Sequence, residues 1–274
     1  MRGNTQIMKN KYIDGEKKEI HETDYYANIH ISPLNKRIVI KDYQGSNIRG
    51  LTNKIIEIAR DKQLTKIWIK TKKEDVELFK KAGYNKEAVI KGYYCGEDAV
   101  SMAYFLNKKR KTRTDKKKKQ EILSEIRNIK EKYNYNLQSY DFKIATEADI
   151  PKLTELYDNV FTSYPYPINK PGYLKKMMNN DVIYGIIYDK NRVVAAASAE
   201  TVPEYKNAEM TDFATLPEYR KQGLAAYILK QLESKLKDIN YQCLYTIARS
   251  KIYGIIKIFS QAGYCYTGTL VNNC

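Results

Sequence analysis

The sequence is poor in the residues that build many catalytic and metal centres. Its 274 residues include two histidines, His21 and His30, and four scattered cysteines without a Cys-x-x-Cys pair. A histidine-based triad, a zinc site and a disulfide framework are therefore not expected. Carboxylates, tyrosine and water remain for proton transfer, and we predict that no metal is bound.

Long apolar runs are also missing. No uninterrupted stretch approaches the ~20 apolar residues that a membrane-spanning helix needs. The first residues, 1–6, are polar and lack the apolar stretch of a signal peptide. We therefore predict a cytoplasmic protein that makes no membrane contact.

Basic residues, in contrast, are in excess. The chain has 48 Lys and Arg against 32 Asp and Glu, a formal net charge of +16. Half of the excess comes from residues 108–119, where nine basic residues accompany one acid, Asp115. A basic face can bind nucleic acid, but a single concentrated run is more typical of a solvated linker. We expect no nucleic-acid partner, and keep a non-catalytic nucleic-acid-binding module as an alternative.

The most informative motif follows residues 208–215, which have the pattern of a strand. Pro217 ends that strand, and apolar residues spaced by three or four over 224–236 indicate an amphipathic helix. Between them stands Arg220-Lys-Gln-Gly-Leu-Ala225. The first turn of a helix offers free backbone N–H groups and a positive dipole, and glycine lets the backbone approach a ligand closely. The motif therefore predicts a pyrophosphate site.

With its neighbours, this motif resembles the acyl-CoA loop of the GNAT N-acetyltransferases. A second motif, Ile258-Phe-Ser-Gln-Ala-Gly-Tyr264, resembles the end of the last helix of that family, and residues 142–151 are similar to its opening strand and helix. The resemblance covers residues 140–274 and implies an α/β fold with a mixed sheet flanked by helices. It also implies acetyl-CoA as cosubstrate, bound by Phe213, Ala214, Thr215, Arg220, Lys221, Gln222, Gly223, Leu224 and Ala225.

Three further stretches narrow the resemblance. Residues 209–215, 245–249 and 263–273 are similar to the β-lysine N6-acetyltransferases, which make the osmolyte N6-acetyl-β-lysine. The implied reaction is acetylation of the N6 amine of β-lysine, a small cationic amine supplied in that family by a lysine 2,3-aminomutase. Another amine, of a polyamine, lysine or a protein, is the enzymatic alternative.

Acetyl transfer needs a base, because fewer than about one lysine side chain in a thousand is neutral at pH 7. Glu209 lies where several GNAT enzymes hold a catalytic glutamate, and Asp212 is its rival. Strand alternation places the two acids on opposite faces, but GNAT strands often bulge here, which can re-aim one side chain. The alternative that both acids only pair with Arg220 and Lys221 stays open.

Other groups complete the expected chemistry. A backbone N–H within 213–215 is expected to polarise the thioester carbonyl. Where the family usually has a tyrosine that protonates the leaving thiolate, this chain has Phe259, so Tyr253, Tyr264 or water must act instead. The acceptor needs acids for its ammonium group, and Glu200 and Asp212 are the candidates. Arg249 is the candidate cation for its carboxylate, and the rings of Tyr164 and Tyr166 are candidates for the wall of its pocket.

The first half of the chain repeats the element order of the second. A helix after Gly50, a strand at 66–70 and the phrase Phe79-Lys-Lys-Ala-Gly-Tyr84 match their counterparts at 224–264. We predict a smaller, degenerate GNAT-like unit at 1–107, a basic linker with a helix at 108–139 and the catalytic GNAT domain at 140–274. Because the second unit stops where the family usually adds a strand, we expect either a truncated chain or another element over that edge.

Overall fold

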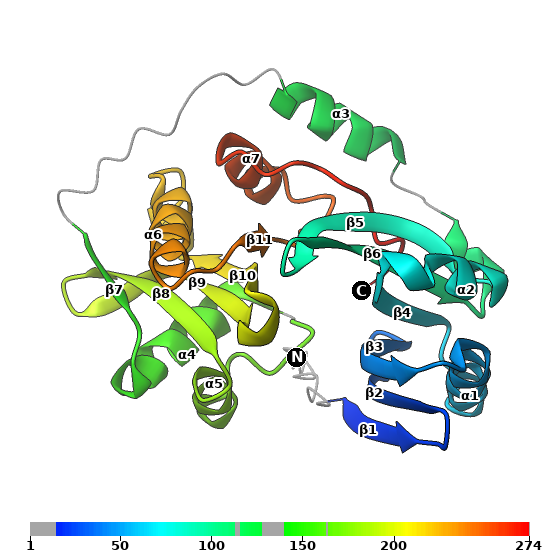
Figure 1. Ribbon diagram of the computed structural model, residues 1–274. Helices are drawn as coiled ribbons and strands as arrows, with labels where there is room; N and C mark the ends of the chain where they lie inside the picture. Colours follow the sequence, from blue (N-terminus) through cyan, green and yellow to red (C-terminus); the bar gives the residue numbers. More distant parts are fainter. Residues whose placement is uncertain (1–14, 113–115, 128–139, 163, 274) are drawn as a thin grey trace, which may run out of the picture.

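The protein is built from two β-sheets that stand side by side, each with its own helices (Figure 1). The computed structural model describes residues 15–112, 116–127, 140–162 and 164–273. Residues 1–6, residues 113–115 of the basic run and residues 128–139 of the predicted linker lie outside the described residues. No helix within the described ranges is long and apolar enough to cross a bilayer.

The first half forms a six-stranded sheet in the order β1-β2-β3-β4-β6-β5. Its elements are β1 (Glu16–His21), β2 (Tyr25–Ser32), β3 (Arg37–Gly45), α1 (Ile48–Asp61), β4 (Lys66–Lys72), α2 (Val76–Lys81), β5 (Asn85–Tyr94) and β6 (Glu97–Phe105).

The two faces of this sheet differ, because alternate side chains of a strand point to opposite sides. On β3 and β4 the isoleucines, among them Ile38 and Ile67, are buried in the core with the apolar side of α1. The residues between them, such as Trp68 and Lys70, lie on the opposite face and line the space between the two halves.

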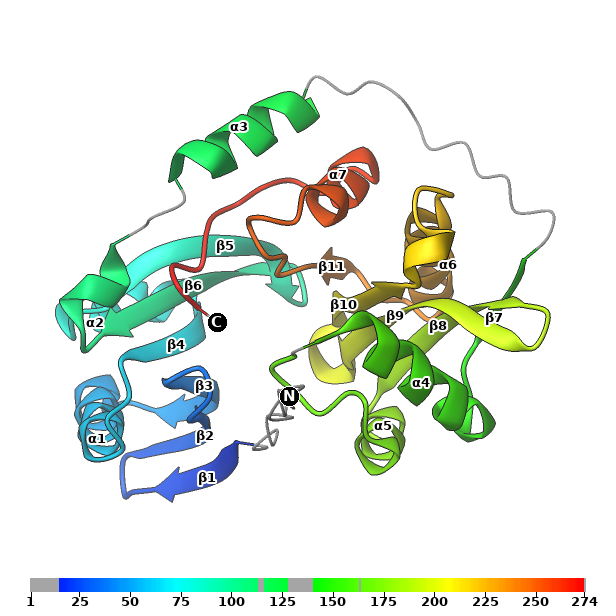
Figure 2. The same cartoon turned by 180° about the vertical axis from the view of Figure 1, so that it is seen from behind.

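The second half forms a five-stranded sheet in the order β11-β10-β9-β8-β7. Its elements are β7 (Asp141–Ile144), α4 (Ile150–Val160), α5 (Pro171–Met178), β8 (Val182–Asp189), β9 (Arg192–Val202), β10 (Asn207–Thr215), α6 (Leu224–Asp238), β11 (Cys243–Tyr245) and α7 (Tyr253–Gln261). The sheet has α4 and α5 on one face and α6 on the other (Figure 2), so the predicted mixed sheet flanked by helices is confirmed.

Close packing of α6 depends on Gly185 of β8. A Cβ at this position would come within 3.0 Å of Phe142 and 3.1 and 3.2 Å of Ile228 and Leu232 on α6. The central strand β9 is buried from Val193 to Ala199, as expected for a strand that is covered on both faces.

The same succession of pairings occurs in both sheets. In each sheet, antiparallel strands are followed by one parallel pair whose strands are joined through a helix. The pair is β3 and β4, joined through α1, in the first sheet, and β10 and β11, joined through α6, in the second. The first sheet then continues, because β6 inserts between β4 and β5. The duplication and the division into three ranges stay predictions.

The C-terminal segment crosses from α7 to the first half, where it runs beside β5 (Figure 2). Thr269 donates its backbone N–H to the Glu87 carbonyl at 3.0 Å, and Val271 donates to Glu87 Oε1 at 2.8 Å. Lys66 Nζ binds both the Glu87 carboxylate, at 2.9 Å, and the Val271 carbonyl, at 2.9 Å. We call Lys66, Glu87 and Val271 the C-terminal latch.

Part of the basic run takes part in this junction. The Arg110 guanidinium donates to the carbonyls of Lys36, Asn35 and Asn272 at 2.8 Å each. The interpretation of residues 108–119 as a solvated linker is therefore wrong for Arg110, which ties the C-terminal segment to the first half. Helix α3 (Lys116–Arg127) follows, with Ile122 and Ile126 buried.

Candidate active site

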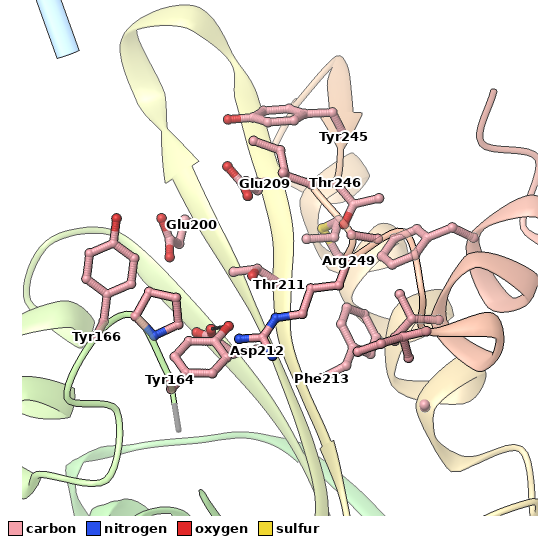
Figure 3. Close-up of a pocket in the computed structure, with 18 of the residues that line it drawn as sticks. Tyr164, Tyr166, Glu200, Glu209, Thr211, Asp212, Phe213, Tyr245, Thr246 and Arg249 are labelled. Carbon is pink, nitrogen blue, oxygen red and sulfur yellow. Dashed lines mark hydrogen bonds between the residues drawn. The ribbon is translucent and has the colours of Figure 1, made fainter. Parts of the chain in front are cut away.

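A large cavity of about 1610 Å³ lies between the two halves. The second half lines it with the ends of β9, β10 and β11, the loop after α4 and the start of α6. The first half contributes β3, β4 and Tyr93 of β5. Figure 3 shows the acidic and aromatic side chains of the second half that surround this space.

Strand β10 carries a bulge at the centre of the cavity. Thr211 pairs with Ser198 and Ala214 pairs with Ala196, so two residues of β10 oppose one residue of β9. Asp212 accordingly has φ of 55°. A bulge interrupts the ladder and leaves backbone groups for other partners, so the predicted bulge is present where an acyl-CoA ligand would run along the strand.

Helix α6 begins as the pyrophosphate prediction requires. Its N-cap, Gly223, has φ of 81° and no capping side chain, and the residues of the first turn line the cavity. Helix α1, at the matching place in the first half, is capped by its own Asn47, whose Oδ1 accepts from the Gly50 N–H at 2.7 Å. A capped turn is a poorer anion site, and the degeneracy of the first unit stays a prediction.

Eight of the nine residues expected to bind acetyl-CoA line the cavity. Ala214 does not, because its side chain is 1% exposed and packs in the core. Arg220 is exposed and donates from Nε to the Thr215 carbonyl at 3.2 Å, which links the motif to the end of β10.

Glu209 of β10 lies between two polar side chains on the neighbouring strands. Its partner on β9 is Glu200, and its partner on β11 is Tyr245. Tyr245 hydrogen-bonds the Glu209 carboxylate, and Lys70 Nζ donates to the Tyr245 hydroxyl at 2.8 Å. Glu200, Glu209 and Tyr245 thus form a row of side chains across three strands, with Glu209 in the middle. Lys70 connects this row to the first half.

Burial sets the protonation of the two glutamates. It raises the pKa of Glu209, and Lys70, Lys41 and the Tyr245 hydrogen bond oppose that shift. The pKa of Glu200 is raised to about 8, mainly by burial and then by the charges of Glu209 and Asp212. The Glu200 side chain still reaches solvent inside the cavity, so it is enclosed by protein and remains open to a ligand.

Asp212 has a different environment. It is 7% exposed, accepts from the Tyr164 hydroxyl at 2.5 Å and accepts from Ser198 Oγ at 2.7 Å. Burial raises its pKa, and these two hydrogen bonds lower it. The interpretation that Glu209 and Asp212 only pair with Arg220 and Lys221 is wrong, since their hydrogen-bond partners are Tyr245, Tyr164 and Ser198.

The predicted acceptor residues all line the cavity. Tyr164 holds Asp212, and Tyr166 stacks on Tyr173 with centroids 6.5 Å apart and an angle of 11°. Arg249 is exposed and enters from the segment between β11 and α7 (Figure 3).

The position of the missing tyrosine is filled by a packed ring. Phe259 lines the cavity and meets Phe213 edge-on, with centroids 5.3 Å apart. Of its proposed substitutes, Tyr253 is exposed on α7, and Tyr264 packs behind Phe259 with centroids 4.8 Å apart. Neither residue lines the cavity.

The first half contributes side chains to the cavity that were not predicted from the sequence. Lys41, Lys70 and Trp68 all line the cavity. The available signal was the phrase Lys66-Ile-Trp-Ile-Lys70, whose alternation places basic and aromatic side chains on one face. A basic strand face ordinarily indicates solvent, so the phrase alone did not point to a site.

Comparison with known proteins gives matches over most of the chain. Residues 150–252 match the family model described as the acetyltransferase (GNAT) family. The chain is 39% identical over 246 residues to a β-lysine N(6)-acetyltransferase of Methanococcus maripaludis, and this alignment covers 89% of each chain. It is 32% identical over 258 residues to the N-acetyltransferase YodP of Bacillus subtilis, which covers 94% of each. A β-lysine N(6)-acetyltransferase of Methanosarcina mazei is 30% identical over 239 residues, covering 79% of this chain and 88% of that one.

Proposed function

Because the chain belongs to the acetyltransferase (GNAT) family, whose members use acetyl-CoA, we propose that it acetylates the N6 amine of β-lysine. Two of the matching proteins carry that activity in their names. The alignments extend over most of both halves, so the similarity includes the first-half wall of the cavity as well as the acetyl-CoA loop.

The observation that carries the proposal is the position of Glu209. Its carboxylate lies in the same cavity as the bulge of β10 and the uncapped start of α6. A carboxylate whose pKa is raised by burial is a better base near neutral pH than an ordinary glutamate. Asp212 is the weaker candidate, since its carboxylate already accepts two hydrogen bonds.

The reaction proceeds by direct attack. Glu209, directly or through a water, takes a proton from the N6 ammonium, and the neutral amine forms a C–N bond with the thioester carbonyl. A backbone N–H within 213–215 stabilises the developing oxyanion. The C–S bond then breaks and the CoA thiolate takes a proton from water. The proton that the attacking nitrogen loses as it becomes the amide neutralises the hydroxide left by that water, and the proton on Glu209 is released to solvent.

The remaining side chains position the two ligands. Lys221, Gly223 and the first turn of α6 hold the pyrophosphate. Glu200 and Asp212 attract the second ammonium group of the acceptor, Arg249 is the predicted partner of its carboxylate, and Tyr164 and Tyr166 form its wall. The product, N6-acetyl-β-lysine, serves as an osmolyte in this proposal, and a lysine 2,3-aminomutase supplies the substrate in the cytoplasm.

Free-CoA release from acetyl-CoA tests the proposal with β-lysine, α-lysine and spermidine as separate acceptors. We expect turnover with β-lysine to exceed that with the other two. Glu209→Gln should lose about 10²- to 10⁴-fold in kcat while acetyl-CoA still binds, and Asp212→Asn should lose less. Turnover confined to spermidine would contradict the substrate, and a larger loss in Asp212→Asn would exchange the roles of the two acids.

A further inference from the structure

The first half places two lysines in the cavity, and they have different surroundings. Lys70 Nζ donates to the Tyr245 hydroxyl and lies over three rings, those of Trp68, Tyr93 and Tyr245, at 5.7, 4.8 and 5.0 Å from their centroids. This ammonium is held by cation–π contacts and a hydrogen bond. Lys70 is therefore engaged in supporting the row through Tyr245 to Glu209.

Lys41 is not engaged in this way. It follows Ile40 on β3, lines the cavity and is exposed there. Among the residues that the structure describes, the Lys41 side chain has no hydrogen-bond or ion-pair partner. A cation that lines a cavity and has no anion at contact distance is suited to bind one from a ligand.

Two acids of the second half share the cavity with Lys41. Glu200 and Glu209 are cross-strand partners on β9 and β10, and both line the cavity that Lys41 lines from β3. An extended diamino acid carries one carboxylate and two amines, which matches one cation and two acids in the same cavity.

We propose that Lys41, in place of the Arg249 predicted from the sequence, binds the carboxylate of the acceptor and that the first half thereby selects diamino acids over diamines. This inference rests on the proposed function, because it concerns the acceptor of the same reaction. The acceptor ammonium then meets Glu200, and the distant amine reaches Glu209. A neutral or cationic group in place of the carboxylate leaves Lys41 facing a ligand without a matching charge.

The test compares β-lysine with its carboxamide, which keeps the chain and removes the negative charge. A hydrogen bond to a charged group corresponds to a factor of about 10 to 100 in kcat/KM. We expect Lys41→Gln to lower kcat/KM for β-lysine by that factor, through KM, and to leave the carboxamide within about twofold. Lys18→Gln, an exposed lysine of β1 outside the cavity, is the matched control and should change neither value.

Two outcomes of this comparison would overturn the proposal. One is an equal loss for both acceptors in Lys41→Gln, which would indicate a general effect on the fold or on the acids. The other is a carboxylate-selective loss in Arg249→Gln with none in Lys41→Gln, which would give the clamp to Arg249.

A binding measurement separates this inference from the proposed function. Trp68 is the only tryptophan of the chain and lines the cavity, so its fluorescence reports acceptor binding without turnover. If β-lysine is not acetylated, titration of wild type and Lys41→Gln with α-lysine and with pentane-1,5-diamine still tests the carboxylate preference. Equal affinity for the amino acid and the diamine, or no response to either, would refute the role of Lys41.

Discussion

Removal of Lys66 is expected to destabilise the protein strongly, because it breaks the C-terminal latch in a place that water does not reach. The side chains of Lys66 and Glu87 are 0% and 3% exposed. Burial lowers the pKa of Lys66 to about 8, although Glu87 opposes that shift. Because the pKa of Lys66 is lowered, the cost of removing its ammonium from water outweighs the attraction between Lys66 and Glu87.

The magnitude follows from the groups left behind. In Lys66→Met the Glu87 carboxylate stays buried without its counter-ion, which typically costs about 3–5 kcal/mol. In the double variant Lys66→Met/Glu87→Met the charges are replaced together, which is often close to neutral. The Val271 N–H and carbonyl then lose their partners, and two hydrogen bonds at about 1 kcal/mol each leave a loss of about 2 kcal/mol.

Urea unfolding followed by circular dichroism measures these differences. Lys62→Met is the control, since Lys62 pairs with Glu16 at 2.8 Å on an exposed surface and should change stability by less than about 1 kcal/mol. The double variant should be more stable than Lys66→Met alone. If Lys66→Met lies within about 1 kcal/mol of wild type, or if the double variant loses the sum of both single changes, the reasoning is wrong.

Three further results are expected. The acidic limb of the pH profile of kcat/KM should lie above the ordinary glutamate range, since burial raises the pKa of Glu209. Glu209→Gln should lack this limb. A limb that is unchanged in the variant would mean that another group titrates there. Gly223→Ala places a side chain at φ of 81°, which costs about 1–2 kcal/mol. We expect calorimetry to show acetyl-CoA binding weakened about tenfold and acceptor binding retained. Unchanged affinity for acetyl-CoA would contradict the pyrophosphate site. The unfolded chain loses its Glu200 proton near pH 4.5, whereas the raised pKa keeps that proton on the folded protein up to about pH 8. The free energy of unfolding should therefore fall as the pH rises through that interval. Glu200→Gln should remove this part of the slope, raising Tm at pH 8 more than at pH 5, and equal slopes would disprove the shift.

The parts of the site that could be predicted depend on short-range rules. Pro217 cannot continue a ladder and Gly223 favours a left-handed N-cap, so strand, turn and helix were readable from neighbouring residues. Glu209 was identified because a family motif fixes its distance from that turn. Its raised pKa could not be predicted, because burial depends on the first half and on Tyr245.

The parts that could not be predicted depend on contacts between distant segments. Arg110 and Asn272 lie 162 residues apart and Lys66 and Val271 lie 205 apart, and no local pattern specifies such pairings. Asp212 shows the same limit, since the bulge was expected but the orientation of its carboxylate follows from Tyr164 and Ser198. Lys41 could be assigned to a strand, yet the residues opposite it come from another sheet.

The uncapped start of α6 also has a consequence for the lifetime of the protein. Helix α1 has its cap in Asn47, whereas α6 begins at a glycine and has no capping side chain in the described part of the chain. In our proposal the pyrophosphate of acetyl-CoA completes that turn, so the cosubstrate stabilises the fold as well as taking part in the reaction. At a concentration 100 times its Kd, a ligand adds about 2.7 kcal/mol to the free energy of unfolding. The amount of enzyme that survives proteolysis should therefore rise and fall with the supply of acetyl-CoA, without any separate regulatory site.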